Sequence, residues 1–182
     1  MLVIDPGIWS EPRALRGADA VLVTHEHADH VDVLRLLGAG LPVFAPDGAL
    51  IPGLVTEPVR PGEAFAVAGF QVQAVGGRHA AVLDDQQTCA NLGYVVDGLL
   101  YHPGDALHVP TTPVETLLVP LQASWLKTSE AVAFVREVRP GRAFGIHDGQ
   151  INERALSSIN GWISEHGNTD YAWLAPGSEV PR

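Results

Sequence analysis

At residues 24–30 the chain reads Thr-His-Glu-His-Ala-Asp-His, directly after the apolar residues 20–23. The apolar residues predict a short buried strand, which would present the following side chains together at its carboxyl end. Imidazole nitrogens and carboxylate oxygens are ligands of zinc, manganese and iron. The stretch therefore predicts a metal site.

The spacing within this stretch suggests two metal ions rather than one. On an extended or tightly turning segment, His25 and His27 can point the same way, while Asp29 and His30 can point to a second position nearby. The alternative is a solvated polar loop in which Asp29 caps the following helix. Polarity alone does not require three histidines so close together, so the metal site is favoured.

The motif His-x-His-x-Asp-His after a strand resembles the signature of the metallo-β-lactamase-fold hydrolases. Further motifs follow in the order of that family: Asp5-Pro6-Gly7, Gly76-Gly77-Arg78-His79, Pro103-Gly104-Asp105 and Gly145-Ile146-His147-Asp148. The resemblance covers residues 2–176 and implies an α/β fold, the four-layer αββα sandwich.

The resemblance also implies seven metal ligands: His25, His27 and His79 for a first ion, Asp29, His30 and His147 for a second, and Asp105 as the bridge between them. Two divalent ions, zinc first and manganese or iron as alternatives, would share a hydroxide, because each lowers the pKa of a bound water. Asp29 would orient this hydroxide or pass its proton on. Asp29, for this role, and Asp105, as the bridge, are the catalytic candidates. Without the resemblance, a lone histidine such as His147 would be read as an ordinary core or surface group.

The function that the resemblance implies is a binuclear metal-dependent hydrolase of a small ester, lactone or phosphodiester. The Asp-Pro-Gly start and the His-Pro-Gly-Asp motif are most similar to the branch with the ascorbate-6-phosphate lactonases. Three alternatives stay open: a phosphodiesterase or nuclease, an iron-dependent redox protein of the same fold, and a non-catalytic binding protein. Specificity would lie in loops such as residues 80–90, a candidate lid whose conformation the sequence does not give.

Other polar residues could support the metal centre or contact substrate. Asp5 could hydrogen-bond the metal loop or a ligand histidine, or satisfy its own turn. His102 and His108 flank the Pro-Gly-Asp motif, and His108 is a substrate candidate. Lys127 is another, because it precedes a helix N-terminus and could bind a phosphate or carboxylate; the alternative is an exposed lysine. Cys89 could be a ligand, but a packing role is favoured.

Length and composition predict one domain over residues 1–182, with 46% hydrophobic residues and no linker. The single cysteine excludes an intramolecular disulfide, and we expect a cytoplasmic enzyme without a leader or a membrane span. The net charge of −10 argues against a nucleic-acid or anionic-membrane binder. Two divalent ions would still attract an anionic small-molecule substrate locally.

Local patterns predict several elements. Residues 91–96 and 99–101, joined by Asp97-Gly98, predict a hairpin. Residues 31–37 predict a helix that packs through Val31, Leu34 and Leu37 and stops at Gly38. The runs between residues 55 and 75 predict a β-meander. The later elements are a helix over 129–138 capped by Thr128 or Ser129, a strand over 142–146, a helix over 152–163 and a strand over 171–174.

The Asp-Pro-Gly turn begins at residue 5, whereas relatives usually carry a β-hairpin before it. We therefore expect the first sheet to lack this hairpin, which leaves the first strand as an open edge with Leu2 and Ile4 uncovered. A homodimer would cover that edge. Rearrangement of the first turns, or a start downstream of the true one, is the alternative.

Overall fold

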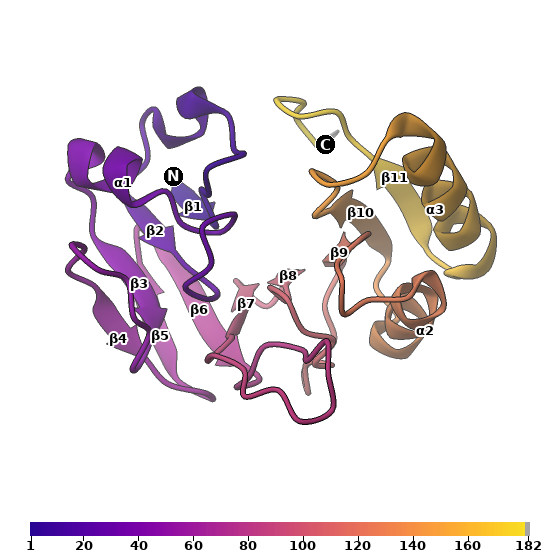
Figure 1. Ribbon diagram of the computed structural model, residues 1–182, viewed down its shortest axis with the longest axis horizontal. Coiled ribbons are helices and arrows are strands. Elements are labelled where there is room, and N and C mark those ends of the chain that lie inside the picture. Colours follow the sequence, from indigo (N-terminus) through magenta and orange to yellow (C-terminus); the bar gives the residue numbers. More distant parts are fainter. Residues whose placement is uncertain (181–182) are drawn as a thin grey trace.

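The computed structural model describes residues 1–180, whose strands form two sheets (Figure 1). The first sheet has the order β1-β2-β3-β4 and is parallel throughout: β1 (Leu2–Ile4), β2 (Ala20–Leu22), β3 (Val43–Pro46) and β4 (Glu57–Val59). The second has the order β11-β10-β9-β8-β7-β6-β5: β5 (Ala64–Val67), β6 (Phe70–Val75), β7 (Gly93–Val96), β8 (Leu100–His102), β9 (Thr116–Pro120), β10 (Arg142–Ile146) and β11 (Asp170–Trp173).

Helices cover the outer faces of both sheets, which gives the expected αββα sandwich. A 3-10 helix, η1 (Pro12–Leu15), precedes β2, and α1 (Val33–Ala39) packs on the first sheet. On the other side of the molecule, α2 (Thr128–Val138) and α3 (Glu153–His166) lie against the second sheet (Figure 1). Among residues 1–180, no helix combines the length and the apolarity needed to cross a bilayer.

Three separate apolar cores correspond to the three interfaces of the four layers. Strand β2 and the residue after it show how alternation divides them: Val21 and Val23 pack under α1, whereas Leu22 packs between the sheets. Tyr94 and Val72 of the second sheet meet Leu22 in that central core. The third core lies between the outer face of the second sheet and the two long helices, where Phe134 and Val135 of α2 are buried.

The predicted hairpin over residues 91–101 is confirmed. Strands β7 and β8 are antiparallel, and Asp97 and Gly98 at the turn have φ values of 52° and 67°. These left-handed conformations match the turn type that an Asp-Gly pair favours. The strand after this hairpin, β9, runs parallel to β8 and leads into the half of the sheet that the two long helices cover.

The prediction for residues 31–38 was wrong about the buried face. Helix α1 begins at Val33, after Asp32, whose carboxylate accepts the Arg35 N–H at 3.0 Å. Of the three residues predicted to pack, Val31 is buried ahead of the helix, whereas Leu34 is 83% and Leu37 51% exposed, and Leu36 is the buried leucine. Gly38 lies inside the helix, which ends before Gly40 at a φ of 63°.

Two further predictions need correction. The runs of residues 55–75 do not form one meander, because β4 pairs in parallel with β3 in the first sheet while β5 and β6 form a hairpin in the second. Helix α2 starts after Lys127 rather than after Thr128 or Ser129, and the Glu130 carboxylate accepts the Lys127 N–H at 2.8 Å.

Strand β1 lies at the edge of the first sheet, as expected from the sequence. Its apolar side chains are not left uncovered, which corrects that part of the expectation. Leu2 and Ile4 are half-buried and pack against the core between the two sheets. The homodimer stays a prediction, which light scattering across a dilution series would test.

Candidate metal centre

The seven predicted ligands lie together on loops that follow strands of both sheets. The loop after β2 contributes four of them, and the segments after β6, β8 and β10 contribute His79, Asp105 and His147. Their donor atoms form three overlapping groups, each with all atoms within 4.8 Å of one another: His25, His27 and His79; His25, His30 and Asp105; and Asp29, His30 and His147. Because the groups share members, the structure places the seven residues in one continuous cluster.

Every histidine of the cluster has one ring nitrogen beside another group of the protein. The pairs are His25 Nδ1 with Thr24 Oγ1 (3.0 Å), His27 Nε2 with Cys89 Sγ (4.0 Å), His30 Nδ1 with Asp5 Oδ2 (2.6 Å), His79 Nδ1 with the Ala80 carbonyl (2.6 Å) and His147 Nδ1 with the Gln122 carbonyl (2.5 Å). Such contacts fix the tautomer and the orientation of a ligating imidazole. The other ring nitrogens face the cluster, where His25 Nε2 lies 3.0 Å from His27 Nδ1.

Three buried donor atoms in the centre lack a hydrogen bond to any described residue: His30 Nε2, His147 Nε2 and Asp105 Oδ1. A buried polar atom without a partner costs about 1–3 kcal/mol, so such atoms are rare in folded proteins. Here they converge with the other ligand atoms, and a cation would satisfy them. The donor set therefore fits a metal ion.

Asp105 connects the histidines of the cluster. Its Oδ1 lies 3.3 Å from His30 Nε2, and its Oδ2 lies 3.4 Å from His79 Nε2 and 3.3 Å from His147 Nε2. Its backbone N–H donates to Asn91 Oδ1 at 2.9 Å. Burial alone would raise the pKa of the Asp105 carboxyl, but the neighbouring imidazoles of His147, His30 and His79 hold that pKa well below its usual range.

The surroundings of each histidine in the cluster set its charge. Burial would lower the pKa of His30 and His147, but neighbouring carboxylates outweigh burial and raise both pKa values to about 10. These carboxylates are Asp5 and Asp105 at His30, and Asp105 and Asp29 at His147. Burial and the neighbouring charge of His30 instead lower the pKa of His25 to about 3. At neutral pH the first two are protonated, and His25 is neutral.

Metal loading at pH 7 is therefore expected to release about two protons from the protein, because His30 and His147 must each lose the Nε2 proton to bind an ion, and a further proton from the water that becomes the shared hydroxide. Raising the pH from 7 towards 10 removes this competing protonation, so the metal affinity should increase. Calorimetric titrations in two buffers of different ionisation enthalpy would count the protons. His147→Ala should release about one proton fewer, and loading without proton release would contradict the assignment.

Asp5 contacts the metal loop rather than only its own turn. Its carboxylate accepts the Thr24 N–H at 2.7 Å and the Thr24 hydroxyl at 2.6 Å, and it also holds His30 Nδ1. The same hydroxyl lies beside His25 Nδ1. Asp5 and Thr24 thus orient two ligand histidines. The sequence had indicated this role for Asp5 but not for Thr24.

The remaining candidates lie outside the three donor groups. His102 is buried and accepts the Gly104 N–H at 3.1 Å. His108 is exposed, and its ring lies against Gly76. The Lys127 side chain is 81% exposed, with its Nζ 3.9 Å from Glu130 Oε1. The substrate roles of His108 and Lys127 stay predictions.

Sequence reasoning missed several residues that hold the ligands. Gln122 acts through its carbonyl, which any residue could supply, so no sequence signal marks it. Trp125 donates its indole N–H to Asp105 Oδ2 at 3.2 Å. Asn91 is fully buried and bonds both the Pro103 carbonyl and the Asp105 N–H. A polar residue inside an otherwise apolar strand run was the one available signal for Asn91.

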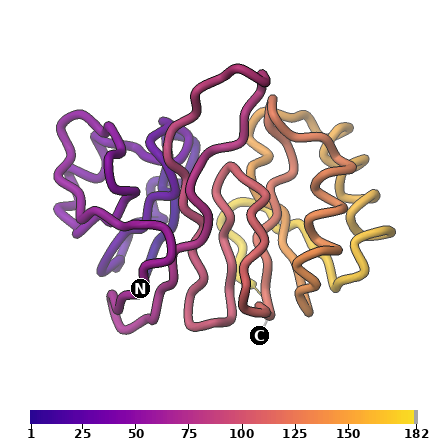
Figure 2. Tube along the Cα trace, turned by 90° about the horizontal axis from the view of Figure 1, so that it is seen from below, coloured from indigo at the N-terminus to yellow at the C-terminus, as the bar shows by residue number. Residues whose placement is uncertain are grey.

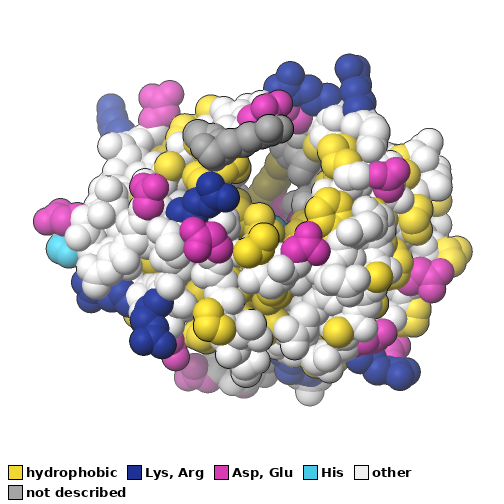
Figure 3. Space-filling view, turned by 180° about the vertical axis from the view of Figure 1, so that it is seen from behind, with side chains coloured by type: hydrophobic (Ala, Val, Ile, Leu, Met, Phe, Trp, Pro, Cys, Tyr) yellow, Lys and Arg dark blue, Asp and Glu magenta, His cyan; other side chains and the backbone are white. Residues whose placement is uncertain are grey.

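A cavity of about 330 Å³ opens beside the donor group of Asp29, His30 and His147, on a molecule that is hollowed on the face shown in Figure 3. Asp29, His30 and His147 lie on one side of this cavity, with Trp9 and Gln150 also in its lining. The segment of residues 80–90 projects as a loop away from the sheets (Figure 2), and most of its side chains are exposed.

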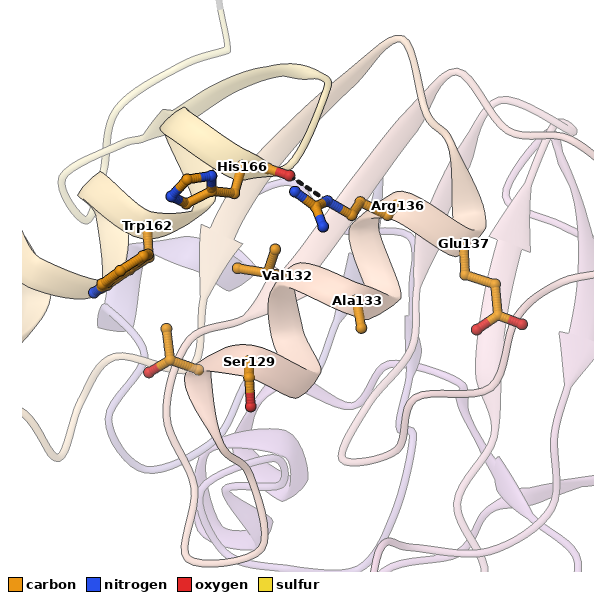
Figure 4. A pocket seen from close by; sticks show the side chains of 8 residues that line it. Ser129, Val132, Ala133, Arg136, Glu137, Trp162 and His166 are labelled. Carbon is orange, nitrogen blue, oxygen red and sulfur yellow. Dashed lines mark hydrogen bonds between the residues drawn. The ribbon is translucent and has the colours of Figure 1, made fainter.

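A larger groove of about 750 Å³ lies elsewhere, between α2 and α3. Figure 4 shows Trp162 and His166 of α3 across from Val132 of α2, with the Arg136 guanidinium donating to the His166 carbonyl. None of the seven candidate ligands lines this groove. The smaller cavity is therefore the one that adjoins the candidate chemistry.

Comparison with known proteins gives consistent similarities. The family described as "Beta-lactamase superfamily domain" matches residues 1–147, a range that contains all seven candidate ligands. Protein Rv0786c of Mycobacterium tuberculosis is 36% identical over 98% of this chain and 90% of its own length. The UPF0173 metal-dependent hydrolase MK1542 of Methanopyrus kandleri is 27% identical over 81% of this chain and 76% of its own.

Solved structures share the fold. Igni18, a metallo hydrolase from Ignicoccus hospitalis, superposes with a TM-score of 0.72 at 17% sequence identity, covering 98% of this chain and 89% of Igni18.

Proposed function

This chain belongs to the metallo-β-lactamase superfamily and is a metal-dependent hydrolase, and from that membership we propose a binuclear enzyme that hydrolyses a small ester, lactone or phosphodiester. The observation that carries the proposal is the set of buried donor atoms without hydrogen bonds, His30 Nε2, His147 Nε2 and Asp105 Oδ1. These atoms belong to the same cluster as the other predicted ligands.

In the proposed centre, each ion has its own set of ligands. His25, His27 and His79 would hold the first ion, and Asp29, His30 and His147 the second; each set is one of the observed donor groups. Asp105 would bridge the ions, which is supported by its contacts with His79 of the first set and His30 and His147 of the second. The ions, which we propose to be zinc, would supply a water nucleophile at neutral pH and polarise the atom that it attacks.

Asp29 is the residue of this centre best placed to handle a proton. The neighbouring His147 imidazole, whose Nε2 lies 3.5 Å from Asp29 Oδ2, is the main reason that the pKa of Asp29 falls to about 2, so Asp29 is a carboxylate at neutral pH. Its side chain is 22% exposed and lines the cavity that His30 and His147 also line. A carboxylate there can orient the attacking water by accepting its hydrogen bond, and can pass a proton to the leaving group.

Asp29→Asn is expected to keep part of the metal but to lower kcat by about 10²-fold or more, since the amide cannot accept a proton. Metal content by elemental analysis and steady-state rates would measure the two effects separately. Asp32→Asn, three residues along the same loop, is the matched control, because Asn caps a helix as well as Asp does. A fully active Asp29→Asn enzyme would remove the proton role.

The proposed function is tested by metal analysis combined with a substrate panel of lactones, carboxylic esters and phosphodiesters. Lactones come first because the Asp-Pro-Gly and His-Pro-Gly-Asp motifs resemble the lactonase-like branch. Double-stranded DNA is included, and no cleavage is expected because the chain has a net charge of −10.

Hydrolysis by the zinc-loaded protein that disappears on chelation would support the proposal. Preparation without oxygen separates the redox alternative, since bound iron together with oxygen consumption would favour that class. A protein that holds two ions and hydrolyses no member of the panel would contradict the proposed substrate classes.

A further inference from the structure

Trp125 contacts the centre from the segment that also supplies the Gln122 carbonyl to His147 Nδ1. It lies between β9 and α2, where its half-buried indole donates its Nε1–H to Asp105 Oδ2 at 3.2 Å. Its ring also lies edge-on to His79, with 6.2 Å between ring centroids and an interplanar angle of 76°. One side chain therefore touches both the carboxylate that joins the histidines and a histidine of the first donor group.

The hydrogen bond restricts how the Asp105 carboxylate can rotate. Oδ2 faces His79, His147 and the indole, whereas Oδ1 faces His30. An indole N–H donates only, so it can pair with a carboxylate oxygen but can neither bind a cation nor titrate. Unlike the histidines, it would keep the same contact whether or not an ion is present.

Asp105 is consequently held at two points. Asn91 fixes its backbone, and Trp125 fixes the turn of its side chain. Groups that hydrogen-bond a ligating carboxylate commonly change metal affinity or activity by about 10–100-fold when they are removed.

We propose that Trp125 is a positioning residue of the metal centre, whose indole N–H holds the Asp105 carboxylate in the orientation in which Oδ2 faces His79 and His147 and Oδ1 faces His30. The inference rests on the proposed metal centre and adds to it a determinant of metal affinity. The competing interpretation is that Trp125 only packs as an apolar wall against His79.

Two substitutions separate these interpretations. Trp125→Phe keeps an aromatic ring beside His79 but has no N–H to donate, whereas Trp125→Leu removes the aromatic ring as well. Trp162→Phe is the matched control, because Trp162 is 54% exposed on α3 and lies outside the donor groups. Co²⁺ is titrated into each metal-free protein, and the visible absorption of the bound ion reports affinity and coordination.

In Trp125→Phe, we expect the Co²⁺ affinity to fall by about 10–100-fold and the visible spectrum of the bound ion to change. We expect the same two changes in Trp125→Leu. Trp162→Phe should match the wild-type protein in both measurements.

Wild-type affinity and an unchanged spectrum in Trp125→Phe would overturn the inference while leaving the metal centre in place. Loss of affinity in Trp125→Leu alone would also overturn it, because packing would then explain the effect. A wild-type protein that binds no Co²⁺ would instead contradict the proposed function.

Discussion

Asp105→Asn is expected to lower hydrolysis by more than about 100-fold and to leave the protein short of metal. Changing a mere hydrogen-bond partner of a ligand already costs about 10–100-fold, and Asp105 contacts three ligand histidines directly. The amide has nearly the same shape, but it carries no charge to offset two cations. Rates on the best substrate, together with elemental analysis after dialysis, would measure the loss.

The fold should survive this substitution, since Asn91 still holds the backbone of residue 105. Asp97→Asn is the matched control: Asp97 accepts the Gln71 N–H at the hairpin turn, where Asn also tolerates the left-handed backbone. Asp97→Asn should remain fully active and metal-loaded. If Asp105→Asn kept near wild-type rate and metal content, the two-ion assignment would be wrong.

Gly7→Ala is expected to disturb the metal loop from outside it. A Cβ on Gly7 would lie 1.8 Å from the Asp29 carbonyl oxygen and 2.6 Å from the His30 nitrogen, so the backbone must move. Hydrogen bonds from Ile8 to the Ala28 carbonyl and from Asp32 to the Pro6 carbonyl tie the two segments together. Overpacking typically costs about 1–3 kcal/mol of unfolding free energy, and here the displaced atoms belong to two ligands.

Denaturant unfolding and Zn²⁺ titration of Gly7→Ala should therefore both show losses. The control is Gly161→Ala in α3, where a Cβ would meet no atom within 4 Å. That change should stabilise the protein by about 0.5–1 kcal/mol without altering metal affinity. An unshifted unfolding midpoint for Gly7→Ala, with normal zinc binding, would mean that the two segments separate easily.

The features predicted well from the sequence depend on residues close together in the chain. The cluster at residues 24–30 carries four of the seven ligands within one loop, and the Asp97-Gly98 turn fixes its own backbone conformation. The later ligands were placed through the resemblance, not through spacing. The structure brings them to the same point because β6, β8 and β10 end on the side of the sandwich where β2 ends.

The errors have physical reasons. Helix α1 starts at Val33 with Asp32 as its cap, so Val31 lies outside the helix and its spacing to Leu34 does not define the helix face. Leu34 and Leu36 are two residues apart, about 200° around the helix, so burying Leu36 exposes Leu34. The apolar pattern predicts that β4 is a strand but does not specify that it pairs with β3 in the first sheet rather than with β5 in the second. The contact between Trp125 and Asp105 joins residues 20 apart, so no local pattern indicates it.

The ligands of the proposed centre come from both sheets, and this has a thermodynamic consequence. An unfolded chain can offer an ion only the local stretch at residues 24–30, whereas the folded chain adds His79, Asp105 and His147. Ions that prefer the folded chain add RT ln(1 + [L]/Kd) to its stability, about 2.7 kcal/mol at a free concentration of one hundred times Kd. The melting temperature of this protein should therefore rise with the free metal concentration, because bound ions would link loops of the two sheets in addition to the packing and the hydrogen bonds between them.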